Sequence, residues 1–98
     1  MPNIEIIGFG LDETYKIREK VLAELAKHYE LGKTTVFDEI LFTLHPEKEV
    51  VDGNGRCKPF VRLYGRSQKE LKFLYDIIVK TEISLRVEFV VLVGVEYT

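Results

Sequence analysis

The sequence predicts an α+β fold, a two-layer sandwich in which two tandem β-α-β units form a four-stranded sheet with two helices on one face. The first observation behind this prediction is an internal repeat. Residues 2–8 and 59–65 each contain a proline, then alternating aliphatic residues, then a glycine. The helical patterns that follow keep the same offset. In the first pattern the apolar residues Ile17 and Val21 take the positions that Leu74 and Ile78 take in the second. A unit repeated in the sequence indicates one supersecondary structure used twice.

The first unit begins with a predicted strand over residues 3–9, where polar and aliphatic side chains alternate. The glycine-rich segment 8–10 interrupts the strand, and Asp12 is the expected N-cap of the following helix. Apolar residues then recur at spacings of three and four and form one stripe: Ile17, Val21, Leu22, Leu25 and Tyr29. Gly32 is expected to end this helix.

The second strand is predicted over residues 36–45. Its apolar side chains share one face: Ile40, Phe42 and Leu44. Pro46 ends the strand because proline has no amide hydrogen to donate to a sheet. Residues 47–58 are expected to form a polar loop or an irregular hairpin. The strongest turn signal of the chain, Asp-Gly-Asn-Gly at 52–55, lies within this loop.

The second unit repeats the order of strand, helix and strand. Residues 60–64 are the predicted third strand. Ser67-Gln68-Lys69-Glu70 is a capping box, in which Ser67 and Glu70 satisfy free amides at a helix start. The apolar stripe of this helix contains Leu71, Leu74, Tyr75 and Ile78. The last strand has the clearest alternation, with apolar residues at every second position from Leu85 to Val91.

These elements are expected to form a single domain over residues 1–98, because the chain is too short for two independent cores. Repeat one covers about residues 2–45, the connecting loop about 46–58, and repeat two about 59–93. Each unit joins parallel strands through a helical crossover, which favours both helices on one face. One alternative is a ferredoxin-like regulator that binds a small ligand; it shares the order of elements but pairs its strands antiparallel.

The sheet face away from the helices is expected to be mixed in character. In the third strand, Phe60, Arg62 and Tyr64 point one way, and Val61 and Leu63 point the other. Neither face is simply polar. A half-buried, mixed face usually indicates self-association, so we expect an oligomer.

Composition excludes several classes of function. Fourteen basic and sixteen acidic residues leave a net charge of −2, so no nucleic-acid partner is expected. Cys57 is the only cysteine, which fits a reducing cytoplasm. The first residues lack the pattern of a signal peptide, and no apolar run approaches the roughly 18 residues that a membrane span needs. We therefore expect a cytoplasmic protein without a membrane partner.

No metal site and no cofactor are expected. His28 and His45 lie far apart, without the spacing of a metal-binding motif. The segment Gly8-Phe9-Gly10 lacks the third glycine of a dinucleotide-binding fingerprint and is interpreted as a turn.

Three features together resemble the tautomerase superfamily, which includes 4-oxalocrotonate tautomerase and macrophage migration inhibitory factor. They are Pro2 before the first strand, the Gly65-Arg66-Ser67 corner before a helix, and Arg86 within Ser84-Leu85-Arg86-Val87. The similarity covers nearly the whole chain but rests on few residues. The longer members of this family carry two β-α-β units in tandem and form trimers. The resemblance therefore implies a homotrimer.

The resemblance also implies roles for four residues. Pro2 matches the amino-terminal proline that acts as a general base. Arg66 matches the arginine that binds a substrate carboxylate, and Arg86 the strand arginine that polarises a carbonyl or enolate oxygen. Lys33 resembles a lysine near the mouth of the site.

Each of these residues also has a purely structural interpretation. Pro2 is then a proline at the start of a strand, Arg66 an exposed residue at a helix start, and Lys33 a solvated residue at a helix end. Arg86 is then expected to pair with Glu88 or Glu5 on the sheet.

The implied function is a tautomerase or isomerase that moves a proton on a small, carboxylate-bearing 2-oxo or enol acid without a cofactor. Burial beside arginines disfavours the charged form of an amine, and a neutral amine can take a proton from the carbon beside a carbonyl. This chemistry requires that Met1 be removed, because an amide nitrogen is not a base. The alternative function is a trimeric scaffold of the same fold that binds or organises other molecules without catalysis.

Overall fold

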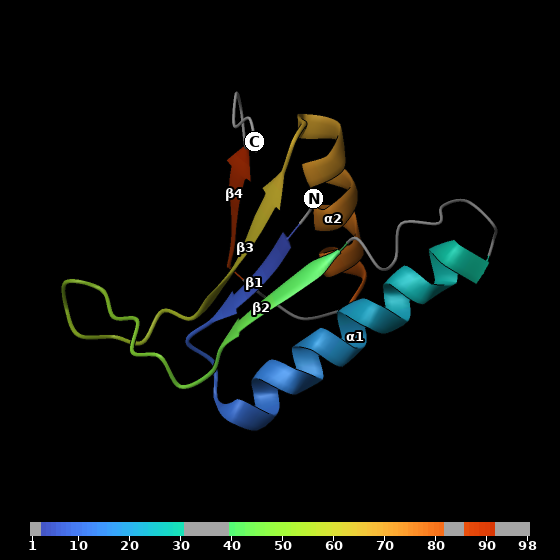
Figure 1. Ribbon diagram of the computed structural model, residues 1–98. Helices are drawn as coiled ribbons and strands as arrows, with labels where there is room; N and C mark the ends of the chain where they lie inside the picture. The colour runs from blue at the N-terminus through green and yellow to red at the C-terminus, as the bar shows by residue number, and fades with distance from the viewer. Residues whose placement is uncertain (1–2, 31–39, 82–85, 92–98) are drawn as a thin grey trace, which may run out of the picture.

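The computed structural model describes residues 3–30, 40–81 and 86–91, the side chains of 28–30 excepted. Within these ranges the chain contains two strand-helix-strand units separated by a loop (Figure 1). The elements are β1 (Asn3–Ile7), α1 (Leu11–Glu30), β2 (Leu41–His45), β3 (Phe60–Gly65), α2 (Gln68–Lys80) and β4 (Val87–Val91).

The four strands form one sheet in the order β2-β1-β3-β4. Pairing is parallel inside each unit, between β1 and β2 and between β3 and β4. The two units meet through antiparallel pairing of β1 with β3. The expected tandem β-α-β fold is therefore confirmed, and parallel pairing within each unit excludes the antiparallel alternative.

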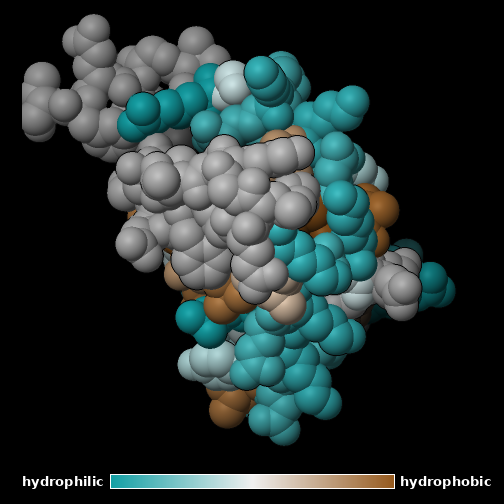
Figure 2. Space-filling view, turned by 90° about the vertical axis from the view of Figure 1, so that its right-hand side faces the viewer, coloured by the Kyte–Doolittle hydropathy of each residue, from teal (hydrophilic) through white to brown (hydrophobic). Residues whose placement is uncertain are grey.

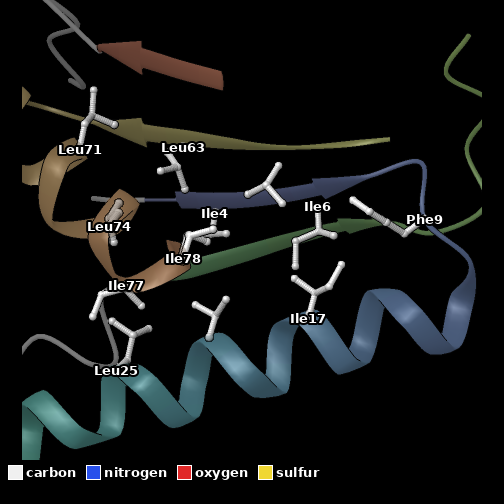
Figure 3. Packing of buried hydrophobic residues seen from close by; sticks show 12 residues of the cluster. Ile4, Ile6, Phe9, Ile17, Leu25, Leu63, Leu71, Leu74, Ile77 and Ile78 are labelled. Carbon is white, nitrogen blue, oxygen red and sulfur yellow. The ribbon is translucent and has the colours of Figure 1, made fainter. Parts of the chain in front are cut away.

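Both helices cover the same face of the sheet and enclose the core with it (Figure 1). Figure 3 shows side chains of the two helices pointing toward those of the central strands. The buried cluster consists of Ile4, Ile6, Phe9, Ile17, Val21, Leu25, Val61, Leu63, Leu71, Leu74, Ile77 and Ile78. On the side shown in Figure 2, hydrophilic residues cover most of the coloured surface. Burial of the apolar residues between the helices and the sheet stabilises the two-layer fold, because burying apolar area is the main favourable term in folding.

The repeat in the sequence corresponds to a repeat in the structure. Ile17 of α1 and Leu74 of α2 are both buried, and so are their repeat partners Val21 and Ile78. Helix packing therefore uses the same positions in each unit, as the shared offset predicts.

The start of α2 confirms the capping box, with one difference in detail. The Ser67 hydroxyl accepts a hydrogen bond from the Glu70 amide at 3.2 Å. The Glu70 carboxylate accepts from the amide of Arg66, one residue before the cap, at 3.3 Å. The first contact satisfies an amide that a helix start leaves without a partner, and the second holds the backbone just before the cap.

The start of α1 corrects the prediction for Asp12. The helix begins at Leu11, and Asp12 lies in its first turn rather than at the cap. The Gly10 carbonyl accepts the first helical hydrogen bond, from the Thr14 amide at 2.9 Å, and Gly10 therefore holds the cap position. A carboxylate in the first turn still interacts favourably with the helix dipole. Gly32 and the first residues of the predicted strand 36–45 lie outside the described residues.

The loop between the units contains the predicted turn. The Asp52 carboxylate accepts hydrogen bonds from the amides of Asn54 at 2.8 Å and Arg56 at 3.0 Å. Gly55 has a φ of 77°, which glycine adopts readily. Among the described residues, no helix is long and apolar enough to cross a membrane.

Gly8 lies where the chain turns after β1, and it packs closely against Val50 and Pro59 of the loop. Its φ is +89°, and a Cβ atom there would lie 3.1 Å from Pro59 Cα and 3.2 Å from Val50 Cγ2. Both the backbone angle and the contacts therefore favour glycine at this position.

We expect Gly8→Ala to lower the free energy of unfolding by about 1–3 kcal/mol, because it strains the backbone and crowds Pro59. Urea unfolding followed by circular dichroism measures this loss. The matched control is Gly53→Ala, because a Cβ at Gly53 would meet no atom within 4 Å. The control is expected to change stability by less than about 0.5 kcal/mol. Equal losses in the two variants would contradict the role given to Gly8.

Candidate functional site

Arg66 lies at the corner between β3 and α2. It follows Gly65, the last residue of β3, and precedes the capping residue Ser67. Its backbone amide is held by Glu70, and the residue is exposed. The corner therefore fixes the backbone of Arg66, while the guanidinium is accessible from solvent.

The start of β1 lies beside this corner. Asn3, the first residue of β1, pairs with Tyr64 in β3 and with Leu41 in β2. The Thr43 hydroxyl on β2 donates a hydrogen bond to Asn3 Oδ1 at 3.1 Å. Because β1 and β3 run in opposite directions, the first residue of one lies near the last residue of the other. This end of the sheet therefore brings Asn3 close to the segment that carries Arg66.

Arg86 lies at the other end of the sheet. Its carbonyl accepts a hydrogen bond from the Val61 amide at 2.8 Å, near the beginning of β3. Arg66 follows the end of the same strand, and at about 3.3 Å per residue the two positions are roughly 16 Å apart along it. The backbones of the two arginines therefore lie at opposite ends of β3.

Arg86 forms an ion pair with Glu88, one of the two partners that its structural interpretation predicted. Its side chain is 58% exposed, and its Nη2 atom lies 3.6 Å from Glu88 Oε1. An exposed ion pair of this kind contributes little to stability. Pro2 and Lys33 lie outside the described residues.

A network of polar side chains, which the sequence did not predict, crosses the sheet face opposite the helices. We call this the open face. Glu5 is at its centre, with a side chain only 14% exposed. The Glu5 carboxylate accepts hydrogen bonds from the Tyr64 hydroxyl at 3.0 Å and from Arg62 Nη1 at 3.3 Å. His45 Nε2 lies 3.1 Å from the same carboxylate.

Arg62 extends this network to β4. Its Nε and Nη2 atoms donate to Glu88 Oε2 at 3.3 Å and 3.2 Å. The guanidinium also lies 4.9 Å from the ring centroid of Phe60, a cation–π distance. The hydrogen bond to the Tyr64 hydroxyl, followed by that to Glu88, raises the pKa of Arg62 above its ordinary value. An arginine is in any case protonated at neutral pH, so Arg62 contributes a positive charge to the network.

From the alternation along each strand, one could predict which face of the sheet Glu5, Arg62 and Glu88 occupy. It does not predict that they lie opposite one another. Glu5 faces Arg62 because of the antiparallel register of β1 and β3. Arg62 faces Glu88 because of the parallel register of β3 and β4. Within the described part of the chain, no buried side-chain nitrogen or oxygen lacks a hydrogen-bond partner. The network therefore orders the open face and pairs the buried polar groups that are described on it.

The described residues contain no group of three or more His, Cys, Asp or Glu side chains able to hold a metal ion. Cys57 is a free, exposed thiol in the loop.

Comparison with known proteins shows relatives of the fold only. No protein-family model matches this chain, and no curated protein does. A solved structure described as a protein of unknown function from Vibrio cholerae is similar, with a TM-score of 0.63 and 18% identity over 93% of this chain and 77% of that one. A domain of unknown function (DUF1904) from Sebaldella termitidis is also similar, with a TM-score of 0.54 and 17% identity over 94% of this chain and 87% of that one. At these identities the likeness shows a shared fold.

We expect Glu5→Gln to lower the free energy of unfolding by about 1–3 kcal/mol, because Arg62 loses a charged partner on a partly buried surface. Chemical unfolding at neutral pH measures the change. Glu19→Gln is the matched control, because Glu19 is exposed on α1. A loss no larger than that of Glu19→Gln would show that the network does not stabilise the sheet.

Proposed function

We propose that this protein is a cofactor-independent tautomerase or isomerase that acts on a small 2-oxo or enol acid. The secondary amine of Pro2, freed by removal of Met1, is the general base. Arg66 binds the substrate carboxylate, and Arg86 stabilises negative charge on the carbonyl oxygen. Lys33 contributes at the mouth of the site.

The observation that carries this proposal is the pairing of Asn3 with Tyr64. Pro2 is covalently attached to Asn3, and consecutive Cα atoms are about 3.8 Å apart. Asn3, the residue bonded to Pro2, therefore lies at the end of the sheet where β3 leads into Arg66, which supports this choice of base. An exposed arginine at that corner supplies the paired donors that a carboxylate prefers.

The chemistry follows from these roles. Arg66 orients the acid so that the carbon beside its carbonyl faces the amine. The neutral amine takes a proton from that carbon, and the electrons left behind move onto the carbonyl oxygen. A guanidinium directed at this oxygen stabilises the resulting enolate. Return of the proton to a different atom of the substrate completes the isomerisation and restores the neutral amine.

The distance between the two arginines supports an assembly as the active form. Arg66 and Arg86 belong to opposite ends of β3 in one chain, which supports a site that takes them from different chains. The open face supports the same conclusion, because its central polar side chains are hydrogen-bonded to one another: Glu5, Arg62, Tyr64 and Glu88. Covering such a face leaves few groups without a partner. We assign the assembly as a homotrimer, as the resemblance implies.

The base is tested by the mass and activity of the untagged native chain. Native mass spectrometry is expected to show a particle of three chains, each lighter by one methionine than the 11.4 kDa of the full sequence. Ketonisation of phenylenolpyruvate is expected to fall by about 10²- to 10⁴-fold in Pro2→Ala, because the proton acceptor has changed. Equal rates in the two proteins would remove Pro2 from the mechanism and favour the scaffold function.

The shared site is tested by mixing two variants. Arg66→Ala and Arg86→Ala are each expected to lower kcat/KM by about tenfold or more through loss of a charged hydrogen bond. Unfolding and refolding the two together is expected to restore about a quarter of the wild-type activity, because some sites then take an intact arginine from each chain.

Arg56→Ala is the matched control for these variants, since Arg56 is an exposed arginine in the loop. It is expected to keep wild-type activity alone. If the mixture of Arg66→Ala and Arg86→Ala is no more active than its components, the two arginines do not meet in one site.

A further inference from the structure

A groove lies between α2 and the edge strand β4, apart from the site proposed above. Its volume is about 160 Å³, and its lining residues are Gln68, Leu71, Lys72, Tyr75 and Phe89. Spacings of three and four residues bring the α2 members onto one side of the helix. β4 contributes Phe89, which pairs with Leu63 of β3 and so points toward the helix side of the sheet. The described residues that line the groove therefore come from α2 and β4.

The groove has an aromatic wall. The rings of Tyr75 and Phe89 meet edge to face, with centroids 5.4 Å apart and an interplanar angle of 62°. Phe89 is 51% exposed and Tyr75 is 39% exposed. Leu71, which is almost fully buried, also lines the groove. Two large rings are exposed to water side by side, and a ligand that covers them buries their apolar area, which favours binding.

The groove also has a cationic side. Lys72 is exposed, and among the described residues its ammonium has no ion-pair partner. Gln68, one turn before it on α2, presents an amide that can donate and accept. A positive charge next to an exposed aromatic wall fits a ligand that combines a ring with an anion.

We propose that this groove binds a small, flat aromatic ring that carries one anionic group. The ring packs against Tyr75 and Phe89, and the anion contacts the Lys72 ammonium. The volume agrees with this ligand, because a protein cavity of about 150 Å³ accommodates benzene. The site is independent of the proposed isomerase chemistry, since it uses none of Pro2, Arg66 or Arg86.

Benzoate titrated into the uniformly ¹⁵N-labelled full chain tests the proposal by NMR. Saturable shifts are expected at the amides of residues 68–75 and 89, with a Kd on the order of 1 mM. Benzamide, which has the ring without the charge, is expected to bind about three- to tenfold more weakly. Acetate, which has the charge without the ring, is expected to produce no saturable shift in the groove.

Two lysine variants separate the groove from general attraction of anions. Lys72→Gln is expected to weaken benzoate about three- to tenfold and to leave benzamide unchanged. Lys69→Gln is the matched control, because Lys69 is an exposed lysine of α2 that does not line the groove. It is expected to bind benzoate like the wild type. Phe89→Leu is expected to weaken both ligands, since both use the ring contact.

The proposal is overturned if benzoate shifts do not saturate in the groove, or if Lys69→Gln weakens binding as much as Lys72→Gln. It is also overturned if benzoate and benzamide lose affinity equally in Lys72→Gln. Pro2→Ala is expected to bind benzoate in the groove with unchanged affinity. Failure of the isomerase proposal therefore leaves this result intact, and the two proposals are distinguished.

Discussion

The antiparallel pairing of β1 with β3 is the constraint on which the rest of the structure depends. It joins the two β-α-β units at the centre of the sheet. Its register puts Ile4 opposite Leu63 and Ile6 opposite Val61, all of them buried beneath the helices. A slip by one residue would turn every side chain of a strand to the other face, so the core specifies this register strongly.

The same register organises the open face. With the core pairs in place, Glu5 must lie opposite Arg62, and the carboxylate then reaches the Tyr64 hydroxyl as well. A partly buried carboxylate without donors would be costly, whereas this one has three neighbouring donor groups on two strands. The apolar and polar faces of β1 therefore favour a single alignment, and each reinforces the specificity of the other.

The direction of the strands also determines where the two arginines of the proposed site lie. Antiparallel pairing brings the start of β1 to the corner with Arg66, while parallel pairing of β4 with β3 leaves Arg86 at the opposite end. The site proposed for both arginines is therefore proposed to form between chains. The groove beside Tyr75 and Phe89 does not need a second chain, because both rings come from adjoining elements of the same chain. The isomerase proposal thus depends on contacts between chains, whereas the groove proposal depends on the packing of α2 and β4 within one chain.

The sequence by itself determined the order of the elements, the tandem repeat, the capping box at Ser67 and the turn at 52–55. These features depend on periodicity and on contacts between near neighbours in the chain. The N-cap at Asp12 was wrong, because the exact helix start depends on the backbone path out of Gly8 and Gly10. The functional roles of Pro2, Arg66, Arg86 and Lys33 stay predictions.

Only the tertiary structure decided the strand order, the Glu5 network, the separation of Arg66 from Arg86 and the groove at Phe89. Each of these joins residues that are distant in the sequence. A repeating pattern tells which face a side chain occupies, but not which strand lies beside it or in which direction that strand runs. Those choices are made when both helices and all four strands bury one common core.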